Sequence, residues 1–158
     1  MVDVLTPEQR RLNMSRVRSK DTKPEWLLRR GLHRMGFRFR LHSRDLPGRP
    51  DLVFPRHKAV IFVHGCFWHG HNCSLFKLPE TRQAFWQSKI DSNRKRDEQI
   101  LDRLRSAGWR VMLVWECALR GPRRRQPDDV LEACEKFILE NRPGIRSAGK
   151  TVQIRGAS

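Results

Sequence analysis

Residues 50–63 read PDLVFPRHKAVIFV, two apolar runs separated by a short polar turn. The first run, residues 51–54, opens on Asp51, and the second, residues 59–63, is apolar throughout. Short runs rich in β-branched and aromatic side chains and bounded by proline are typical of β-strands, and an unbroken apolar run is typical of a buried strand. The stretch therefore predicts two consecutive strands, of which the second is buried.

Helical and strand patterns continue on both sides of this stretch. Upstream, they predict a short helix from Thr6 to about Arg18, a helix from Thr22 to Gly36 and a strand over residues 37–41. Downstream, they predict a long helix over residues 81–108, a strand over residues 109–115 and a last helix with Val130, Cys134 and Phe137 on one face. A chain of 158 residues fits one domain, and this order predicts an α/β fold with a small mixed sheet flanked by helices.

The two ends of the chain are expected to lie outside the domain, which spans residues 21–141. Residues 1–20 form a basic arm with few apolar side chains. Residues 142–158 contain four basic residues and no acidic residue among Gly, Ser and Pro, so we expect a mobile basic tail. Five residues of the arm are candidates for phosphate contacts, with a solvated basic face as the alternative. They are Arg10, Arg11, Arg16, Arg18 and Lys20.

The charge of the chain indicates an acidic partner. Lys and Arg number 33 against 17 for Asp and Glu, a formal net charge of +16. Nucleic acid is favoured over an anionic membrane surface, because the basic residues are spread along the chain and are not gathered on one amphipathic helix. No stretch approaches the ~20 apolar residues of a membrane span, and the first thirty residues lack the apolar core of a signal peptide. We therefore expect a cytoplasmic protein without a membrane partner.

A cluster of histidines and cysteines follows the buried strand at residues 64–73. Cys66, His71 and Cys73 offer three ligands to a tetrahedral zinc ion, and Cys117, just past the strand at 109–115, offers a fourth. Thiolate and imidazole suit zinc, and four protein ligands make a closed, structural site. The alternative is that Cys66 and Cys117 are ordinary buried thiols and that the histidines lie on the surface of a loop.

Carboxylates and further histidines indicate a second site. Asp51 opens the first strand of the opening stretch, a position where many metal-dependent nucleases carry a catalytic carboxylate. The acidic-x-Lys motif of those enzymes is absent, since Val63, His64 and Gly65 stand in its place. The hypothesis depends on Asp51 combining with other candidate groups, because an oxygen-ligand site needs several of them to converge. These groups are Glu25, His64, His69 and Asp97.

With these motifs in order, the chain resembles the very short patch repair endonucleases. The matching stretches are LPGRPD at residues 46–51, VIFVHGCFWH at 60–69, LFK at 75–77, TR at 81–82, GWRV at 108–111 and VWECALRG at 114–121. Asn13-Met14 and Asp21-Thr22 also match, so that the resemblance covers about residues 8–122. Residues 123–158 show no such resemblance.

The resemblance implies a restriction-endonuclease-like fold with one structural zinc ion, and nicking of one DNA strand with two catalytic magnesium ions. The implied substrate is double-stranded DNA with a T:G mismatch, left when 5-methylcytosine deaminates and nicked on the 5′ side of the thymine. Mismatch-repair proteins are implied partners, and the enzyme would associate with the nucleoid while bound to DNA. A mismatch has no two-fold symmetry, which favours a monomer.

The resemblance also implies a role for individual residues. Asp51 would bind magnesium together with the backbone carbonyl of Val63, which stands where the family usually has Thr. His69 would activate water as general base. Water around the metal would be held by Glu25, His64 and Asp97. Zinc would be bound by Cys66, His71, Cys73 and Cys117. The aromatic wedge that enters the base stack beside the mismatch would be Phe67, Trp68 and Trp86, with a core position as the alternative for Trp86.

Two other functions fit part of these observations. A zinc-stabilised DNA-binding module without catalysis explains the net charge. It does not require the second site, formed by Glu25, Asp51, His69 and Asp97, because carboxylates repel DNA unless a cation intervenes. A general nuclease of the same fold explains that group as well. Comparing cleavage of mismatched and matched duplexes would distinguish such a nuclease from a mismatch-specific enzyme.

Overall fold

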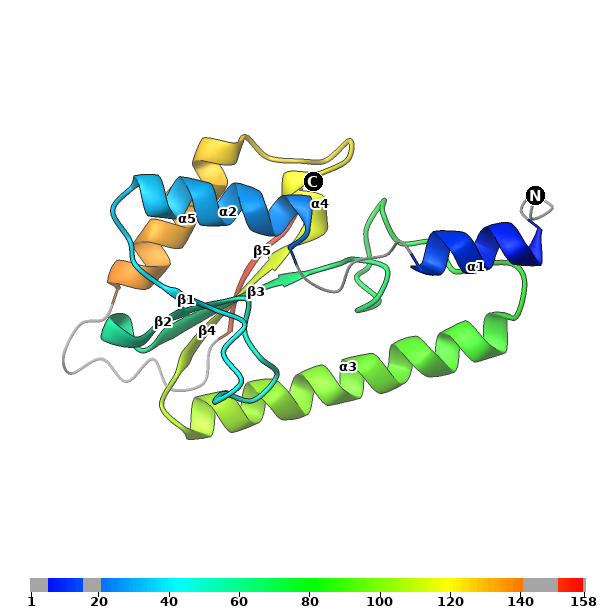
Figure 1. Cartoon of the computed structure of the whole chain (residues 1–158), viewed down its shortest axis with the longest axis horizontal. Coiled ribbons are helices and arrows are strands. Elements are labelled where there is room, and N and C mark those ends of the chain that lie inside the picture. Colours follow the sequence, from blue (N-terminus) through cyan, green and yellow to red (C-terminus); the bar gives the residue numbers. More distant parts are fainter. Residues whose placement is uncertain (1–5, 16–20, 141–150, 158) are drawn as a thin grey trace.

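A mixed five-stranded sheet forms the centre of the molecule (Figure 1). The computed structural model describes residues 6–15, 21–140 and 151–157. The strands, in their order across the sheet, are β1 (Arg40–Leu41), β2 (Leu52–Phe54), β3 (Ala59–His64), β4 (Arg110–Trp115) and β5 (Val152–Ile154). The pairs β1–β2 and β2–β3 are antiparallel, whereas β3–β4 and β4–β5 are parallel. The predicted mixed α/β architecture is thus confirmed.

Helices cover both faces of this sheet (Figure 1). The helical segments are α1 (Pro7–Ser15), α2 (Lys23–Arg34), the 3-10 turn η1 (Pro55–His57), α3 (Gln83–Ser106), α4 (Glu116–Leu119) and α5 (Pro127–Leu139). Figure 1 shows α2 and α5 side by side on one face and α3 on the other, while α1 lies apart from the sheet. In the described ranges, no helix combines the length and the hydropathy needed to cross a bilayer.

The two faces of the sheet carry two separate hydrophobic cores. Alternate residues of the strands explain this division, because successive side chains of a strand point to opposite faces. Leu52, Ile61 and Met112 pack with α2 and α5 in the larger core. Val60, Phe62 and Leu113 pack with α3 in the second core. Both sets are almost fully buried, so the prediction of a buried strand over residues 59–63 is correct for this segment up to Phe62.

Local sequence signals set the ends of α2. The hydroxyl of Thr22 accepts a hydrogen bond from the backbone N–H of Glu25 at 3.4 Å, and Pro24 occupies the first turn, where no N–H partner is needed. Gly36 follows the helix with φ at +98°, a conformation that glycine adopts without strain. These signals are the ones that predicted the helix from the sequence.

The predicted strand over residues 37–41 is shorter than expected. Only Arg40 and Leu41 pair with β2, opposite Val53 and Leu52. The ladder stops because β2 ends at Phe54, and the following Pro55 has no N–H to donate.

The prediction of a mobile tail over residues 142–158 is wrong for its last part. Val152–Ile154 forms β5 and pairs with Met112, Leu113 and Val114 of β4. The N–H of Ala157 also donates to the carbonyl of Arg123, which ties the segment to the basic loop before α5. Residues 142–150 of the predicted tail, and Arg16, Arg18 and Lys20 of the predicted arm, lie outside the described residues.

Packing of α2 on the sheet is tested with two leucine substitutions. Leu32→Ala is expected to lower the free energy of unfolding by about 2–5 kcal/mol, because the fully buried side chain leaves a cavity. Leu139→Ala is the matched control, since this side chain is 56% exposed, and it should change the free energy by about 0.5 kcal/mol or less. Urea titration followed by circular dichroism measures both, and equal losses would contradict the position of α2.

Candidate active site and metal centre

The parallel pairing of β3 with β4 brings the Cys/His cluster together. His64, the last residue of β3, lies opposite Trp115, the last residue of β4. The chain that follows β3 therefore meets the chain that follows β4 at one end of the sheet. Cys66 comes two residues after the first strand end and Cys117 two residues after the second, which explains how residues 51 positions apart become neighbours.

The four predicted zinc ligands form one compact group. One ligand atom from each of Cys66, His71, Cys73 and Cys117 lies within 4.8 Å of every other. Nδ1 of His71 lies 3.6 Å from Sγ of Cys66 and 3.6 Å from Sγ of Cys117. Zinc–ligand distances of about 2.3 Å for sulfur and 2.0 Å for nitrogen would place such a pair about 3.5 Å apart at a tetrahedral ion. The cluster therefore has the size and the donor set to hold a metal ion.

Backbone N–H groups point at the sulfurs of this cluster. The N–H of Cys117 lies 3.4 Å from Sγ of Cys66, and the N–H of Gly156 lies 3.3 Å from Sγ of Cys117. Burial raises the pKa of both thiols above the ordinary value, so that ionised sulfur needs a compensating charge. A bound cation would supply that charge. Cys134 takes no part in this cluster and lies buried in the core between the sheet and α5.

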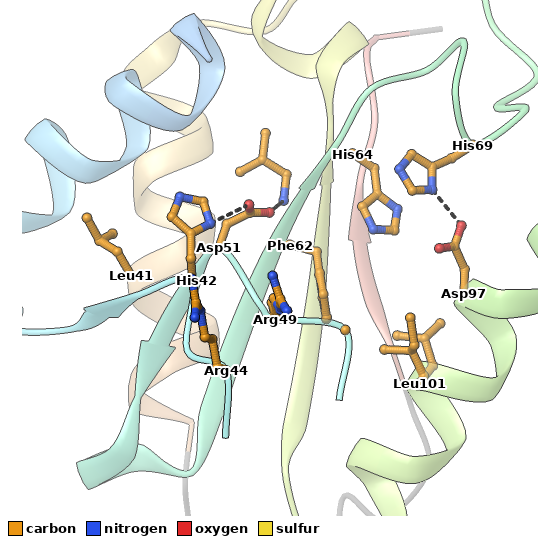
Figure 2. Close-up of a pocket in the computed structure, with 13 residues that line it drawn as sticks. Leu41, His42, Arg44, Arg49, Asp51, Phe62, His64, His69, Asp97 and Leu101 are labelled. Carbon is orange, nitrogen blue, oxygen red and sulfur yellow. Dashed lines mark hydrogen bonds and ion pairs between the residues drawn. The ribbon is translucent and has the colours of Figure 1, made fainter. Parts of the chain in front are cut away.

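A pocket of about 560 Å³ lies beside this cluster, between β3, α3 and the loops around β2. Asp51, His64, His69 and Asp97 all line it, so the structure brings together four of the five predicted catalytic residues (Figure 2). Val63 lines the same pocket. Arg44 and Arg49, which the sequence did not single out, also line the pocket and add positive charge.

Asp51 is held in place from two sides. The backbone N–H of Val63 donates a hydrogen bond of 2.7 Å to Oδ2, and Nδ1 of His42 lies 3.5 Å from Oδ1 (Figure 2). Burial is the main cause that raises the pKa of Asp51 from 3.8 to about 7, although the Val63 hydrogen bond opposes it. The carboxylate is thus costly to ionise in the absence of a cation.

The histidines and Asp97 form a second group in the same pocket. Nδ1 of His69 lies 2.5 Å from Oδ2 of Asp97, and the rings of His64 and His69 stack with centroids 3.8 Å apart and planes 4° apart. Burial lowers the pKa of His64 well below its ordinary value, and Nδ1 of this ring is buried without a hydrogen-bond partner among the described residues. Ligand atoms of the three residues lie within 4.8 Å of one another.

Glu25 does not line the pocket and belongs to a buried charge network behind it. Its Oε2 accepts a hydrogen bond of 2.8 Å from Arg29, and Arg29 also pairs with Asp21 at 2.8 Å. His42 connects this network to the pocket, with Nε2 lying 3.4 Å from Oε2 of Glu25. The sequence offered no signal for His42 or Arg29, because each is an isolated polar residue until the chain folds.

Trp115 separates the Cys/His cluster from the pocket and contacts both. Its ring stacks on His71 with centroids 4.2 Å apart and planes 10° apart. The same ring lies nearly perpendicular to the rings of His64 and His69, with centroids 5.3 Å and 6.3 Å away. Nε1 of Trp115 donates to Oε1 of Gln153 in β5 at 3.1 Å, which fixes the orientation of the indole.

The three predicted wedge residues form an aromatic group. The ring of Phe67 lies 5.1 Å from Trp68 and 5.5 Å from Trp86, and the two tryptophan rings lie 6.1 Å apart. All three side chains are partly exposed. Trp86 belongs to neither hydrophobic core, which argues against the core alternative. Of the predicted arm residues in α1, Arg10 is half-buried and Arg11 exposed.

Comparison with known proteins identifies the family. The family model described as DNA mismatch endonuclease Vsr matches residues 2–75. The chain is 54% identical over 119 residues to the type II nicking enzyme V.XorIIP of Xanthomonas oryzae pv. oryzae, covering 75% of this chain and 88% of that protein. It is 45% identical over 138 residues to the DNA mismatch endonuclease Vsr of Escherichia coli, covering 87% of this chain and 88% of that protein. The chain therefore belongs to the Vsr family of DNA mismatch endonucleases.

Proposed function

We propose that this protein is a magnesium-dependent endonuclease that nicks one strand of DNA on the 5′ side of the thymine in a T:G mismatch. Such mismatches arise when 5-methylcytosine deaminates. The observation that carries the proposal is the convergence of Asp51, His64, His69 and Asp97 on one pocket. The names of the relatives, a mismatch endonuclease and a nicking enzyme, support the same reaction class.

Asp51 and the backbone carbonyl of Val63 are the groups that would hold magnesium. Both residues line the pocket, and carboxylate and carbonyl oxygens are the ligands that this ion prefers. The raised pKa of Asp51 supports a cation here, because a positive charge removes the cost of ionising the buried carboxyl. When bound, two magnesium ions would neutralise charge on the scissile phosphate and on the leaving oxygen.

His69 would act as general base toward the attacking water. With Nδ1–H of His69 donating a hydrogen bond to Oδ2 of Asp97 at 2.5 Å, the lone pair of Nε2 would be left to take a proton from water. His64 stacks on the same ring and limits its rotation. The unpartnered Nδ1 of His64 supports its assignment to holding water, together with Asp97 and, through the network behind the pocket, Glu25.

Mismatch recognition is assigned to Phe67, Trp68 and Trp86. Inserting aromatic side chains into a base stack requires free energy to unstack the bases. A mismatched step requires less of it than a paired one. The group lies in the loop after β3 and at the start of α3, next to the residues that would cut. Insertion into the base stack and cleavage of the strand would thus take place next to each other.

A structural zinc ion is proposed for Cys66, His71, Cys73 and Cys117. Three sulfurs and one imidazole suit zinc, and four protein ligands leave no open position for catalysis. The ion would hold the loop that carries His69, since within this loop Cys66 precedes the residue and His71 and Cys73 follow it. The 3.6 Å spacing between His71 and two of the sulfurs supports this assignment.

The rest of the proposal concerns partners and place of action. The net charge of +16 supports binding to the DNA backbone, with Arg10 and Arg11 of α1 and with Arg16, Arg18 and Lys20 beyond it as candidate phosphate contacts. A single mismatch supports action as a monomer. We also propose that mismatch-repair proteins are partners and that the enzyme associates with the nucleoid in the cytoplasm.

A nicking assay on end-labelled duplexes tests the function. With magnesium, the wild-type protein is expected to make one nick 5′ of the thymine in a T:G duplex and none in a matched C:G duplex, because only the mismatch admits the wedge. Asp51→Asn should lose nicking by at least about 10³-fold, because it removes the charge that would bind the cation. The same variant keeps an oxygen that can accept from Val63, so binding of the T:G duplex should remain.

Each other outcome of this assay rejects a defined part of the proposal. Binding to the T:G duplex without cutting would favour a DNA-binding module without catalysis. Equal cutting of both duplexes would indicate a general nuclease. Nicking by Asp51→Asn at the wild-type rate would remove Asp51 from catalysis.

The zinc assignment is tested by metal analysis of two cysteine variants. Wild-type protein is expected to carry one zinc per chain, and Cys73→Ala should lose it and unfold or aggregate, because the free energy of zinc binding no longer stabilises the fold. Cys134→Ala is the control, since this cysteine is buried in the other core and should keep the metal. A soluble, active Cys73→Ala protein with full zinc content would contradict the assignment.

The raised pKa of Asp51 predicts how stability depends on pH in magnesium-free buffer. Between its ordinary value of 3.8 and about 7, the unfolded chain has lost the proton while the native carboxyl keeps it. The free energy of unfolding therefore falls as the pH rises through this interval and levels off above it. Relative to Asp51→Asn, we expect the free energy of unfolding to fall by about 4 kcal/mol over this range, measured by urea titration. A constant difference between the two proteins would contradict the buried, protonated carboxyl.

A further inference from the structure

His42 lies at the wall of the pocket between two carboxylates from different elements. It follows β1 and has a φ of +46°, in the left-handed region that residues other than glycine rarely adopt. Its backbone N–H donates to the carbonyl of Asp51 at 3.3 Å. The main chain thus holds the imidazole beside the Asp51 carboxylate, and unusual backbone conformations of this kind tend to gather at functional sites.

Both nitrogens of the His42 ring have close neighbours. Nε2 lies 2.8 Å from Nη2 of Arg29, 3.4 Å from Oε2 of Glu25 and 3.8 Å from Oδ1 of Asp21. Nδ1 lies 3.5 Å from Oδ1 of Asp51, the contact drawn as a dashed line in Figure 2. The ring therefore bridges the buried network of α2 to the pocket.

Arg29 decides which ring nitrogen carries the proton. A guanidinium has donors and no acceptor, so at 2.8 Å the Nε2 atom must offer its lone pair. The proton of the neutral ring is then on Nδ1, facing Asp51. Arg29 cannot turn away, because Asp21 and Glu25 each hold it at 2.8 Å and its side chain is 6% exposed.

We propose that His42 is a positioning residue that orients the Asp51 carboxylate, with Arg29 fixing the tautomer of the ring. The N–H of Val63 donates to Oδ2, and Nδ1 of His42 lies 3.5 Å from Oδ1. A proton on this Nδ1 faces Oδ1 and favours one orientation of the carboxylate, in which the remaining lone pairs are left for the cation. At 3.5 Å the contact is longer than a good hydrogen bond, and catalytic hydrogen bonds commonly tighten only when the site is loaded. This inference rests on the proposed function, in which Asp51 binds the catalytic metal.

The tautomer is measured without reference to activity. Long-range ¹H–¹⁵N correlation spectra of the histidine rings distinguish a proton on Nδ1 from a proton on Nε2, and loss of one signal set in His42→Ala assigns the ring. We expect the Nδ1–H form for His42. A proton on Nε2 would overturn the proposal, because the ring would then have no donor toward Asp51.

Kinetics of three variants test the consequence for the reaction. His42→Ala is expected to lower the nicking rate by about 10–100-fold and to raise the magnesium concentration for half-maximal rate, as the loss of a partner of a metal ligand does. Binding of the T:G duplex without magnesium should stay unchanged. His42→Asn keeps a donor near the position of Nδ1 and should restore most of the rate. His33→Ala, an exposed histidine of α2, is the matched control.

The outcomes separate this inference from the proposed function. Wild-type rate and magnesium dependence in His42→Ala would overturn the positioning role, and so would equal losses in the Ala and Asn variants. If the wild-type protein does not nick the T:G duplex at all, the proposed function fails, and the tautomer of His42 still decides whether the ring orients Asp51.

Discussion

The parallel pairing of β3 with β4 is the constraint on which both candidate sites depend. Six residue pairs from Ala59↔Arg110 to His64↔Trp115 keep the two strands in one register. A shift by one residue would exchange the faces of either strand, so the division into two hydrophobic cores opposes it. With this register fixed, the segments that leave the two strand ends carry Cys66 and Cys117 to the same point. The pocket forms where the same end of β3 meets α3.

The Cys/His cluster and the pocket are mechanically connected. Trp115 stacks on His71 and lies nearly perpendicular to the stacked pair of His64 and His69. Because interiors are close-packed, a shift of the indole would move rings on both sides. β5 supports this arrangement from the other end of the chain, through Gln153 to Trp115 and through Gly156 to Cys117. A Cβ atom at Gly156 would lie 2.7 Å from the carbonyl oxygen of Cys117, so the close approach requires glycine.

The fold neutralises only some of the carboxylates in and behind the pocket with its own basic side chains. Arg29 compensates Glu25 and Asp21 inside the network behind the pocket, where burial makes unpaired charge costly. Among the described residues, no arginine or lysine forms an ion pair with Asp51, and burial raises the pKa of this carboxyl to about 7. Arg29 thus neutralises Glu25 and Asp21 within the fold. The Asp51 carboxyl is left available to an external cation. Perturbed carboxyls in a pocket are typical of functional sites.

Local sequence determined the elements and much of the chemistry, whereas the tertiary structure decided which groups meet. Thr22, Pro24 and Gly36 set the ends of α2 through contacts within a few residues, and the apolar run over residues 59–63 marked a buried strand for the same local reason. The spacing of Cys66, His71 and Cys73 likewise made a ligand set visible. The contacts of His42 with Asp51, Glu25 and Arg29 were not predictable, because they depend on the β1–β2 register and on the packing of α2. Neither was β5, since three residues with little pattern become a strand only when β4 offers its hydrogen-bonding groups.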